Sequence, residues 1–163
     1  MAEWVERVDE HDRVLGVVER GEAIERRWLH RVATVVCRDA GGRVLVHRRP
    51  EDSSRFPGAY NWLLGGGVEA GEGYVAAAGR ELAEELGTAA PVPFRFKFLC
   101  EGAISPYWLG VHEALITGTP SPDRREIAWW GWVEEESLPG LMARWPFVPD
   151  SVEAFARYRA LTG

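Results

Sequence analysis

Residues 66 to 88, GGVEAGEGYVAAAGRELAEELGT, constrain this chain more than any other part of it. Glu81, Glu84 and Glu85 stand at helical spacings i, i+3 and i+4, so a helix here carries all three carboxylates on one face. Such like charges repel each other unless a cation lies over them. Mg²⁺ prefers hard oxygen ligands and completes its shell with water and substrate phosphates. Spacing alone is equally consistent with an acidic helix face that is merely solvated.

The residues around the glutamates favour the metal site. The segment fits the pattern G-x5-E-x7-R-E-U-x-E-E-x-G-U, in which U is a bulky apolar residue. The fixed positions are filled by Gly66, Glu72, Arg80, Glu81, Leu82, Glu84, Glu85 and Gly87. Only Thr88 departs from the pattern, and it is β-branched like the aliphatic residues usual there. The chain therefore resembles the Nudix hydrolase superfamily, with its Nudix box at residues 66–88.

Bulk properties limit the other classes of function. With 163 residues, the chain is expected to form a single domain over residues 1–163. Its net charge of −6 disfavours a nucleic-acid polymer or a membrane surface as partner. No apolar stretch suggests a membrane span or a secretory signal, so we expect a cytoplasmic protein, with a homodimer left open. Cys37 and Cys100 lie in apolar settings and are expected to be buried free thiols.

Alternating and apolar runs predict a mixed sheet. The expected strands are 14–18, 32–37, 43–49, 94–99, 107–116 and 127–133. One helix is expected to begin near Gly73 and to end at Gly87, and a second to cover 149–161. On the first helix, Val75, Leu82 and Leu86 form the expected apolar stripe, from which Glu81 and Glu84 point away. Helices around a mixed sheet indicate an α/β fold, and Nudix domains have this α/β/α sandwich architecture.

The resemblance implies hydrolysis of a small-molecule diphosphate linked to some other group, X, with Mg²⁺ as cofactor and Mn²⁺ as an alternative. It implies Glu81, Glu84 and Glu85 as metal ligands, joined by the main-chain carbonyl of Gly65. Arg80 would orient these carboxylates through charge-assisted hydrogen bonds. One glutamate of the cluster would act as general base, and the resemblance does not say which.

Four further residues are candidates for the site. Glu126 precedes a late strand, where Nudix enzymes often place an additional catalytic glutamate, although an exposed loop charge explains it at least as well. Arg48 and Arg49 end a strand near the predicted site and are candidates for holding a phosphate, or are ordinary strand-end arginines. Trp62 precedes the glycines and is a candidate for stacking on a base, although most large aromatic residues belong to the core.

Motifs outside the box resemble a Nudix subgroup that is similar in sequence to isopentenyl-diphosphate isomerase. These motifs are Trp4-Val5-Glu6, Val8-Asp9-Glu10, Leu29-His30-Arg31, His47-Arg48-Arg49 and Phe56-Pro57-Gly58. The isomerase has a catalytic Cys-Gly-His where this chain has Gly65-Gly66-Gly67, so its proton-transferring thiol has no counterpart. His30 matches one of its metal ligands, but alone it is better explained as structural.

Three functions therefore remain. A hydrolase is favoured because the box is intact. An isomerase is disfavoured because the catalytic cysteine is missing. A non-catalytic module that senses a nucleotide is disfavoured because such proteins usually lose box carboxylates, and all of them remain here. The identity of X is open, since specificity depends on variable loops.

Overall fold

A seven-stranded mixed sheet forms the middle of the molecule in the computed structural model, which describes residues 2–163. Its strands run in the order β5-β4-β3-β8-β7, while β6 pairs with β3 and β9 pairs with β4. Only the β3–β8 pair is parallel. The strands are β3 (Arg31–Arg38), β4 (Val44–Arg48), β5 (Tyr60–Asn61), β6 (Leu64–Gly67), β7 (Phe94–Cys100), β8 (Tyr107–Leu115) and β9 (Trp129–Val133).

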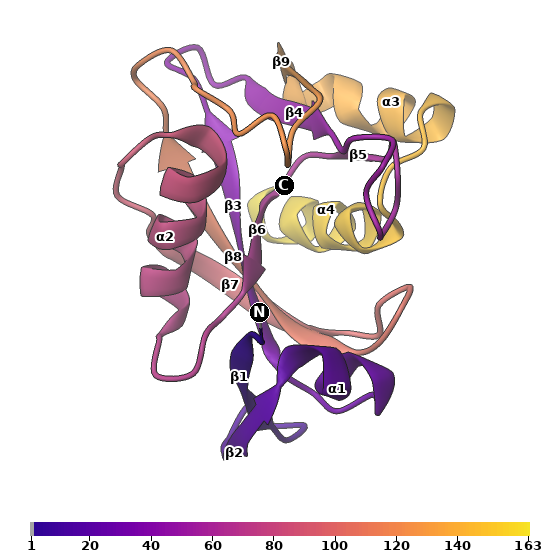
Figure 1. Cartoon of the computed structure of the whole chain (residues 1–163). Helices are drawn as coiled ribbons and strands as arrows, with labels where there is room; N and C mark the ends of the chain where they lie inside the picture. Colours follow the sequence, from indigo (N-terminus) through magenta and orange to yellow (C-terminus); the bar gives the residue numbers. More distant parts are fainter. Residues whose placement is uncertain (1) are drawn as a thin grey trace.

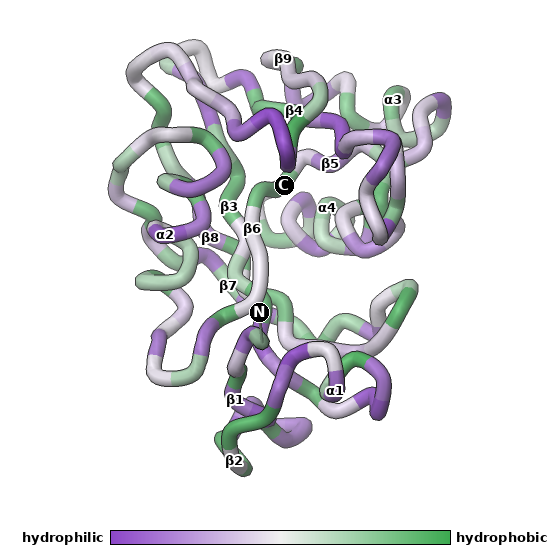
Figure 2. Tube along the Cα trace, in the orientation of Figure 1, coloured by the Kyte–Doolittle hydropathy of each residue, from purple (hydrophilic) through white to green (hydrophobic). Residues whose placement is uncertain are grey.

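Helices cover both faces of this sheet (Figure 1). Helix α2 (Tyr74–Leu86) packs on one face, and α4 (Pro149–Thr162) lies on the other with α3 (Leu138–Arg144) and the short 3₁₀ helix η1 (Glu135–Ser137). The strands in the middle are largely hydrophobic, whereas α2 and α4 alternate between hydrophobic and hydrophilic residues (Figure 2). The α/β/α sandwich predicted from the sequence is confirmed.

Period-two alternation in β3 separates the two cores. Ala33, Val35 and Cys37 face the core under α2, whereas Val36 faces the core under α4. Cys37 and Cys100 are buried and free, as predicted. Among residues 2–163, no helix combines the length and the apolar character that a membrane crossing needs.

An N-terminal unit, which the sequence predicted only in part, docks at one end of the sandwich. It consists of β1 (Trp4–Val8), β2 (Val14–Glu19) and α1 (Arg20–Glu25). Asp12, in the turn between the two strands, fixes it in place with a side chain that is 1% exposed. Asp12 accepts hydrogen bonds from Arg31 at 2.7 Å, Lys97 at 2.6 Å and the Tyr74 hydroxyl at 2.8 Å. The unit thus joins β3, β7 and the start of α2.

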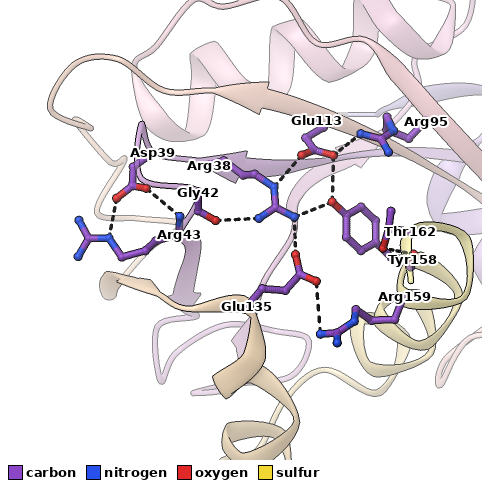
Figure 3. A network of polar contacts seen from close by, with 10 residues as sticks. All are labelled: Arg38, Asp39, Gly42, Arg43, Arg95, Glu113, Glu135, Tyr158, Arg159 and Thr162. Carbon is purple, nitrogen blue, oxygen red and sulfur yellow. Dashed lines mark hydrogen bonds and ion pairs between the residues drawn. The ribbon is translucent and has the colours of Figure 1, made fainter.

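A network of polar contacts around Arg38 ties the sheet to the C-terminal helices (Figure 3). The guanidinium of Arg38 donates to Glu113 of β8 at 2.7 Å and to Glu135 of η1 at 2.5 Å. It also donates to the Tyr158 hydroxyl of α4 at 2.6 Å, and that hydroxyl donates to Glu113 at 3.0 Å. One cation therefore holds groups from three elements.

We expect Arg38→Met to lower the free energy of unfolding by about 3 kcal/mol, because Glu113 and Glu135 would lose a largely buried partner. The matched control is Arg43→Met, which removes a 2.7 Å pair with Asp39 from an arginine that is 48% exposed. Loss of such an exposed pair should change stability by at most about 1 kcal/mol. Urea unfolding of the two variants measures the difference, and equal losses would refute the role given to Arg38.

Candidate active site

A cleft of about 460 Å³ opens where α2, the end of β4 and the N-terminal unit meet. One part of its lining is acidic, with Glu81, Glu84, Glu85, Asp123 and Glu126. Another part is basic, with Arg20, Arg49 and Arg55. Apolar residues complete the wall, among them Val32, Leu63, Leu109 and Val148. The cleft therefore offers carboxylates, guanidinium groups and an apolar surface to one small molecule.

Local sequence places the glutamates there. Gly73 is the N-cap of α2, and Gly87 ends the helix in a left-handed conformation, as predicted. The predicted apolar stripe is wrong at one position, because Val75 is 50% exposed and Ala77 and Ala78 are buried instead. Glu81 also does not point away from the packed face: its side chain is only 12% exposed and lies against Gly66 of β6.

Glu85 is the least satisfied carboxylate in the cleft. Its Oε2 is buried and has no hydrogen-bond partner among the described residues. Burial raises the pKa of Glu85 well above its usual value, and the negative charges of Glu81 and Glu126 raise it further. Burial also raises the pKa of Glu81. A cation or a proton would stabilise this group of carboxylates.

Arg80 fixes the acidic helix to the loop before it. Its guanidinium donates to both carboxylate oxygens of Glu72, at 2.8 and 2.9 Å. It also donates to Glu81 at 3.0 Å and to Glu84 at 3.4 Å. Glu72 in turn accepts from the backbone N–H of Glu69 at 2.9 Å, so it supports the loop. Arg80 therefore contacts two of the three box glutamates through charge-assisted hydrogen bonds.

The donor set suits a hard divalent ion, although no three His, Cys, Asp or Glu side chains between residues 2 and 163 are already gathered in metal-binding geometry. Two of the three box glutamates, Glu81 and Glu84, are paired with Arg80 instead, and the Glu84 side chain is 58% exposed. Gly65 also lines the cleft. The free Oε2 of Glu85 is the orphaned oxygen that a cation would satisfy, so the residues present fit Mg²⁺.

The other sequence candidates separate into two groups. Glu126 and Arg49 line the cleft, as expected. Arg48 does not, because its guanidinium pairs with Glu51 and donates to the Gly58 carbonyl at 3.2 Å. Trp62 is 1% exposed, so the expectation that it stacks on a base is wrong. Its indole N–H donates to the Ser151 carbonyl at 2.7 Å inside the core.

Sequence reasoning missed two arginines and undervalued one histidine. Arg20 comes from the start of α1 and Arg55 from the loop after β4, and neither lies in a motif that marks it. His30, taken as structural, lines the cleft with a residue exposure of 1%. Tertiary contacts alone bring these three segments together.

Buried histidines make the protein sensitive to acid. Burial lowers the pKa values of His30 and His47 from 6.5 to about 4. Between these values the unfolded chain binds more protons, so stability is lost as the pH falls from 6.5 through 4. Each histidine should account for about 3 kcal/mol of this loss.

We expect His47→Gln to lose less stability on acidification than the wild type, as measured by thermal unfolding at pH 6.5 and pH 4.5. His11→Gln is the control, because the His11 side chain is 65% exposed. Identical pH dependence in His47→Gln and the wild type would show that His47 is not the titrating group.

Comparison with known proteins agrees with this geometry. The NUDIX domain family matches residues 28–158. An uncharacterized Nudix hydrolase of Streptomyces coelicolor is 46% identical over 159 residues, which cover 96% of this chain and 88% of that protein. The uncharacterized Nudix hydrolase YfcD of Escherichia coli is 31% identical over 156 residues, covering 94% and 85%.

Solved structures share the architecture. The crystal structure of DR0079 from Deinococcus radiodurans has a TM-score of 0.81 at 26% identity, covering 95% of this chain and 98% of that one. The NUDIX domain of Shewanella oneidensis NrtR, complexed with ADP ribose, has a TM-score of 0.63 at 16% identity, covering 82% and 88%.

A mixed sheet between helices, with a glutamate-bearing helix after a glycine strand, is the Nudix fold. The chain belongs to the Nudix hydrolase family. Nudix hydrolases act on small molecules and generally use a divalent metal such as Mg²⁺.

Proposed function

We propose that this chain hydrolyses a diphosphate linkage in a nucleoside diphosphate derivative or a related organic diphosphate, with Mg²⁺ as cofactor. The single observation that carries the proposal is the position of Glu85. Its unpartnered carboxylate oxygen lies in the cleft, beside the charges of Glu81 and Glu126. That arrangement suits cation binding and proton acceptance at one point.

The residues divide the chemistry between them. Glu81, Glu84, Glu85 and the Gly65 carbonyl would hold Mg²⁺, which when bound neutralises phosphate oxygens and lowers the pKa of coordinated water. Arg80 keeps Glu81 and Glu84 in position through its hydrogen bonds. Glu85 is the first candidate for general base, because its carboxylate lies in the cleft and burial raises its pKa.

Substrate contacts come from the remaining wall. Arg49 lies close enough to Glu85 for its charge to lower the pKa of that carboxyl, so it would hold a phosphate oxygen next to the acidic residues. The apolar surface of Val32, Leu63 and Leu109 would receive part of X. Glu126 is the second candidate for general base, because its charge reaches Glu85.

Isomerase activity, the alternative suggested by the resemblance of the outer motifs, lacks the proton-transferring thiol of the isomerase. Gly65-Gly66-Gly67 are paired with β3 as part of β6 and offer no titratable side chain. Neither cysteine lines the cleft, and burial raises the pKa of Cys100 to about 12. We therefore propose hydrolysis and not isomerisation for this chain.

The test is a panel of nucleoside di- and triphosphates, nucleotide sugars, ADP ribose, dinucleotides and isopentenyl diphosphate, each incubated with Mg²⁺ or with EDTA. We expect ³¹P NMR to show orthophosphate or a nucleoside monophosphate from at least one member, only with Mg²⁺. Thiol-blocking reagents should leave turnover unchanged. Formation of the allylic isomer of isopentenyl diphosphate, without phosphate release from any compound of the panel, would show that the protein is an isomerase and not a hydrolase.

A further inference from the structure

We infer that Arg20, Arg49 and Arg55 form a metal-independent binding site for a phosphate monoester, a phosphoryl group with three free oxygens. The inference rests on the proposed function only in treating the cleft as the substrate site. Each arginine comes from a different segment: Arg20 begins α1, Arg49 follows β4, and Arg55 lies in the loop before β5.

The guanidinium groups of Arg20 and Arg49 lie close enough to Arg55 for their charges to act on it, and only one of the three arginines is paired with a carboxylate. Partial burial lowers the pKa of Arg55, and the charges of Arg20 and Arg49 lower it further, although the charge of Glu3 acts in the opposite direction. Among the described residues, the Arg55 guanidinium forms no hydrogen bond or ion pair, and Arg49 uses its Nε on the Arg55 carbonyl at 2.8 Å. Only Arg20 has a carboxylate partner, Glu3 at 3.2 Å. Clustered arginines that mostly lack carboxylate partners favour the binding of an anion.

Unsatisfied donors in the same place support a ligand independently of charge. The Nε of Arg20 is buried and has no hydrogen-bond partner among residues 2–163. His30 is 1% exposed and lines the cleft, and among the described residues its ring nitrogens form no hydrogen bond of normal geometry, although the Trp28 backbone lies close to the ring. The charges of Arg20 and Arg55 both act on this imidazole, which places His30 beside the arginines. Buried polar groups are normally satisfied, so a bound group is expected to complete them.

The chemistry of the site selects the ligand. A phosphate monoester carries close to two negative charges at neutral pH and offers three oxygens, whereas a doubly esterified phosphate carries one charge and two free oxygens. Guanidinium forks bind phosphate oxygens in pairs, and several of them can share one phosphoryl group. Three arginines and a neutral imidazole donor therefore match a monoester better than a diester.

Such a group can come from two sources. It is the terminal phosphoryl of a nucleoside diphosphate, which is attached by an anhydride bond but has the same three free oxygens, or it is a phosphate monoester carried elsewhere on X. The pair ADP and ADP ribose differs in whether the terminal phosphoryl is free. The pair NADP⁺ and NAD⁺ differs in one phosphate monoester on the ribose.

The first measurement is calorimetric titration of the intact chain with inorganic phosphate in EDTA, so that metal and catalysis play no part. We expect the wild type to bind phosphate and Arg55→Met to bind it about tenfold more weakly or not at all. Arg144→Met is the control, because Arg144 is an exposed residue of α3 outside the cleft. Melting curves confirm that each variant is folded, and Arg20→Lys, which keeps the charge, should bind phosphate better than Arg20→Met.

The second measurement repeats the titration with the two matched pairs. Tighter binding of ADP than ADP ribose, abolished in Arg55→Met, assigns the site to the terminal phosphoryl. The same result for NADP⁺ over NAD⁺ assigns it to a phosphate on X. Absence of phosphate binding, equal binding by Arg55→Met, or no preference within either pair would overturn the inference. Hydrolysis is not measured in this test, so failure of the proposed function would be seen separately.

Discussion

Glu85→Gln is expected to abolish metal-dependent hydrolysis while the protein stays folded. The substitution keeps the shape of the side chain but removes the charge and the basic oxygen that lies unpartnered in the cleft. Loss of a metal-binding carboxylate should remove several kcal/mol of transition-state stabilisation, which is about a thousandfold or more in rate. The measurement is kcat on a substrate identified from the panel, with Mg²⁺ in excess.

The stability of this variant separates loss of chemistry from loss of fold. Burial disfavours the charged form of Glu85, so in EDTA at neutral pH the melting temperature of Glu85→Gln should equal or exceed that of the wild type. The control is Glu136→Gln, which neutralises an exposed glutamate of η1 and should change neither property. Wild-type turnover by Glu85→Gln would show that the metal site lies elsewhere.

Alanine substitutions at two neighbouring glycines of β6 are expected to have different effects. One should destabilise the fold, and the other should reduce activity. Gly65 has a φ of 155°, and a Cβ there would overlap the carbonyl oxygen of Ala33 and lie 2.8 Å from the Thr34 Cα. Because backbone cannot move aside, Gly65→Ala should separate β6 from β3 and cost at least about 4 kcal/mol of stability. The variant should be largely unfolded or recovered only in aggregates.

Gly66→Ala should instead leave the fold intact. A Cβ at Gly66 would lie 2.6 Å from a carboxylate oxygen of Glu81, the end of a flexible side chain that can rotate away. Displacement of Glu81 should lower kcat/KM by about a hundredfold. Urea unfolding and kinetics of both variants test the distinction. A stable, active Gly65→Ala would refute the close packing of β6 on β3.

Much of the fold follows from local patterns in the sequence. Glycines at both ends set the limits of α2, and alternation in β3 assigns its residues to two cores. Strand β6 could not be predicted in this way, because a run of glycines has no side-chain pattern and only its register with β3 defines it. The depth of Glu81 escaped prediction for a related reason, since a glycine strand lets the helix approach closely.

The candidate site residues that lie on a single helix could be predicted from the sequence. Glu81, Glu84 and Glu85 needed only helical spacing, and Arg80 directly precedes them in the same motif. Arg20 and Arg55 reach the cleft only through tertiary contacts between distant segments, which no local sequence pattern indicates. Trp62 was misassigned because an aromatic residue beside a glycine loop suits either a ligand or the core, and here the core gains a buried hydrogen bond.

Binding of Mn²⁺ measured by electron paramagnetic resonance tests the central claim, that the box glutamates form a divalent metal site. Free Mn²⁺ gives a strong signal that is lost on coordination to protein. We expect the wild type to reduce this signal, and excess Mg²⁺ to restore it by competition. Glu81→Ala combined with Glu84→Ala should leave the signal unchanged, whereas Glu136→Gln should behave as the wild type does. Equal Mn²⁺ binding by the wild type and the double variant, or none by either, would contradict the account.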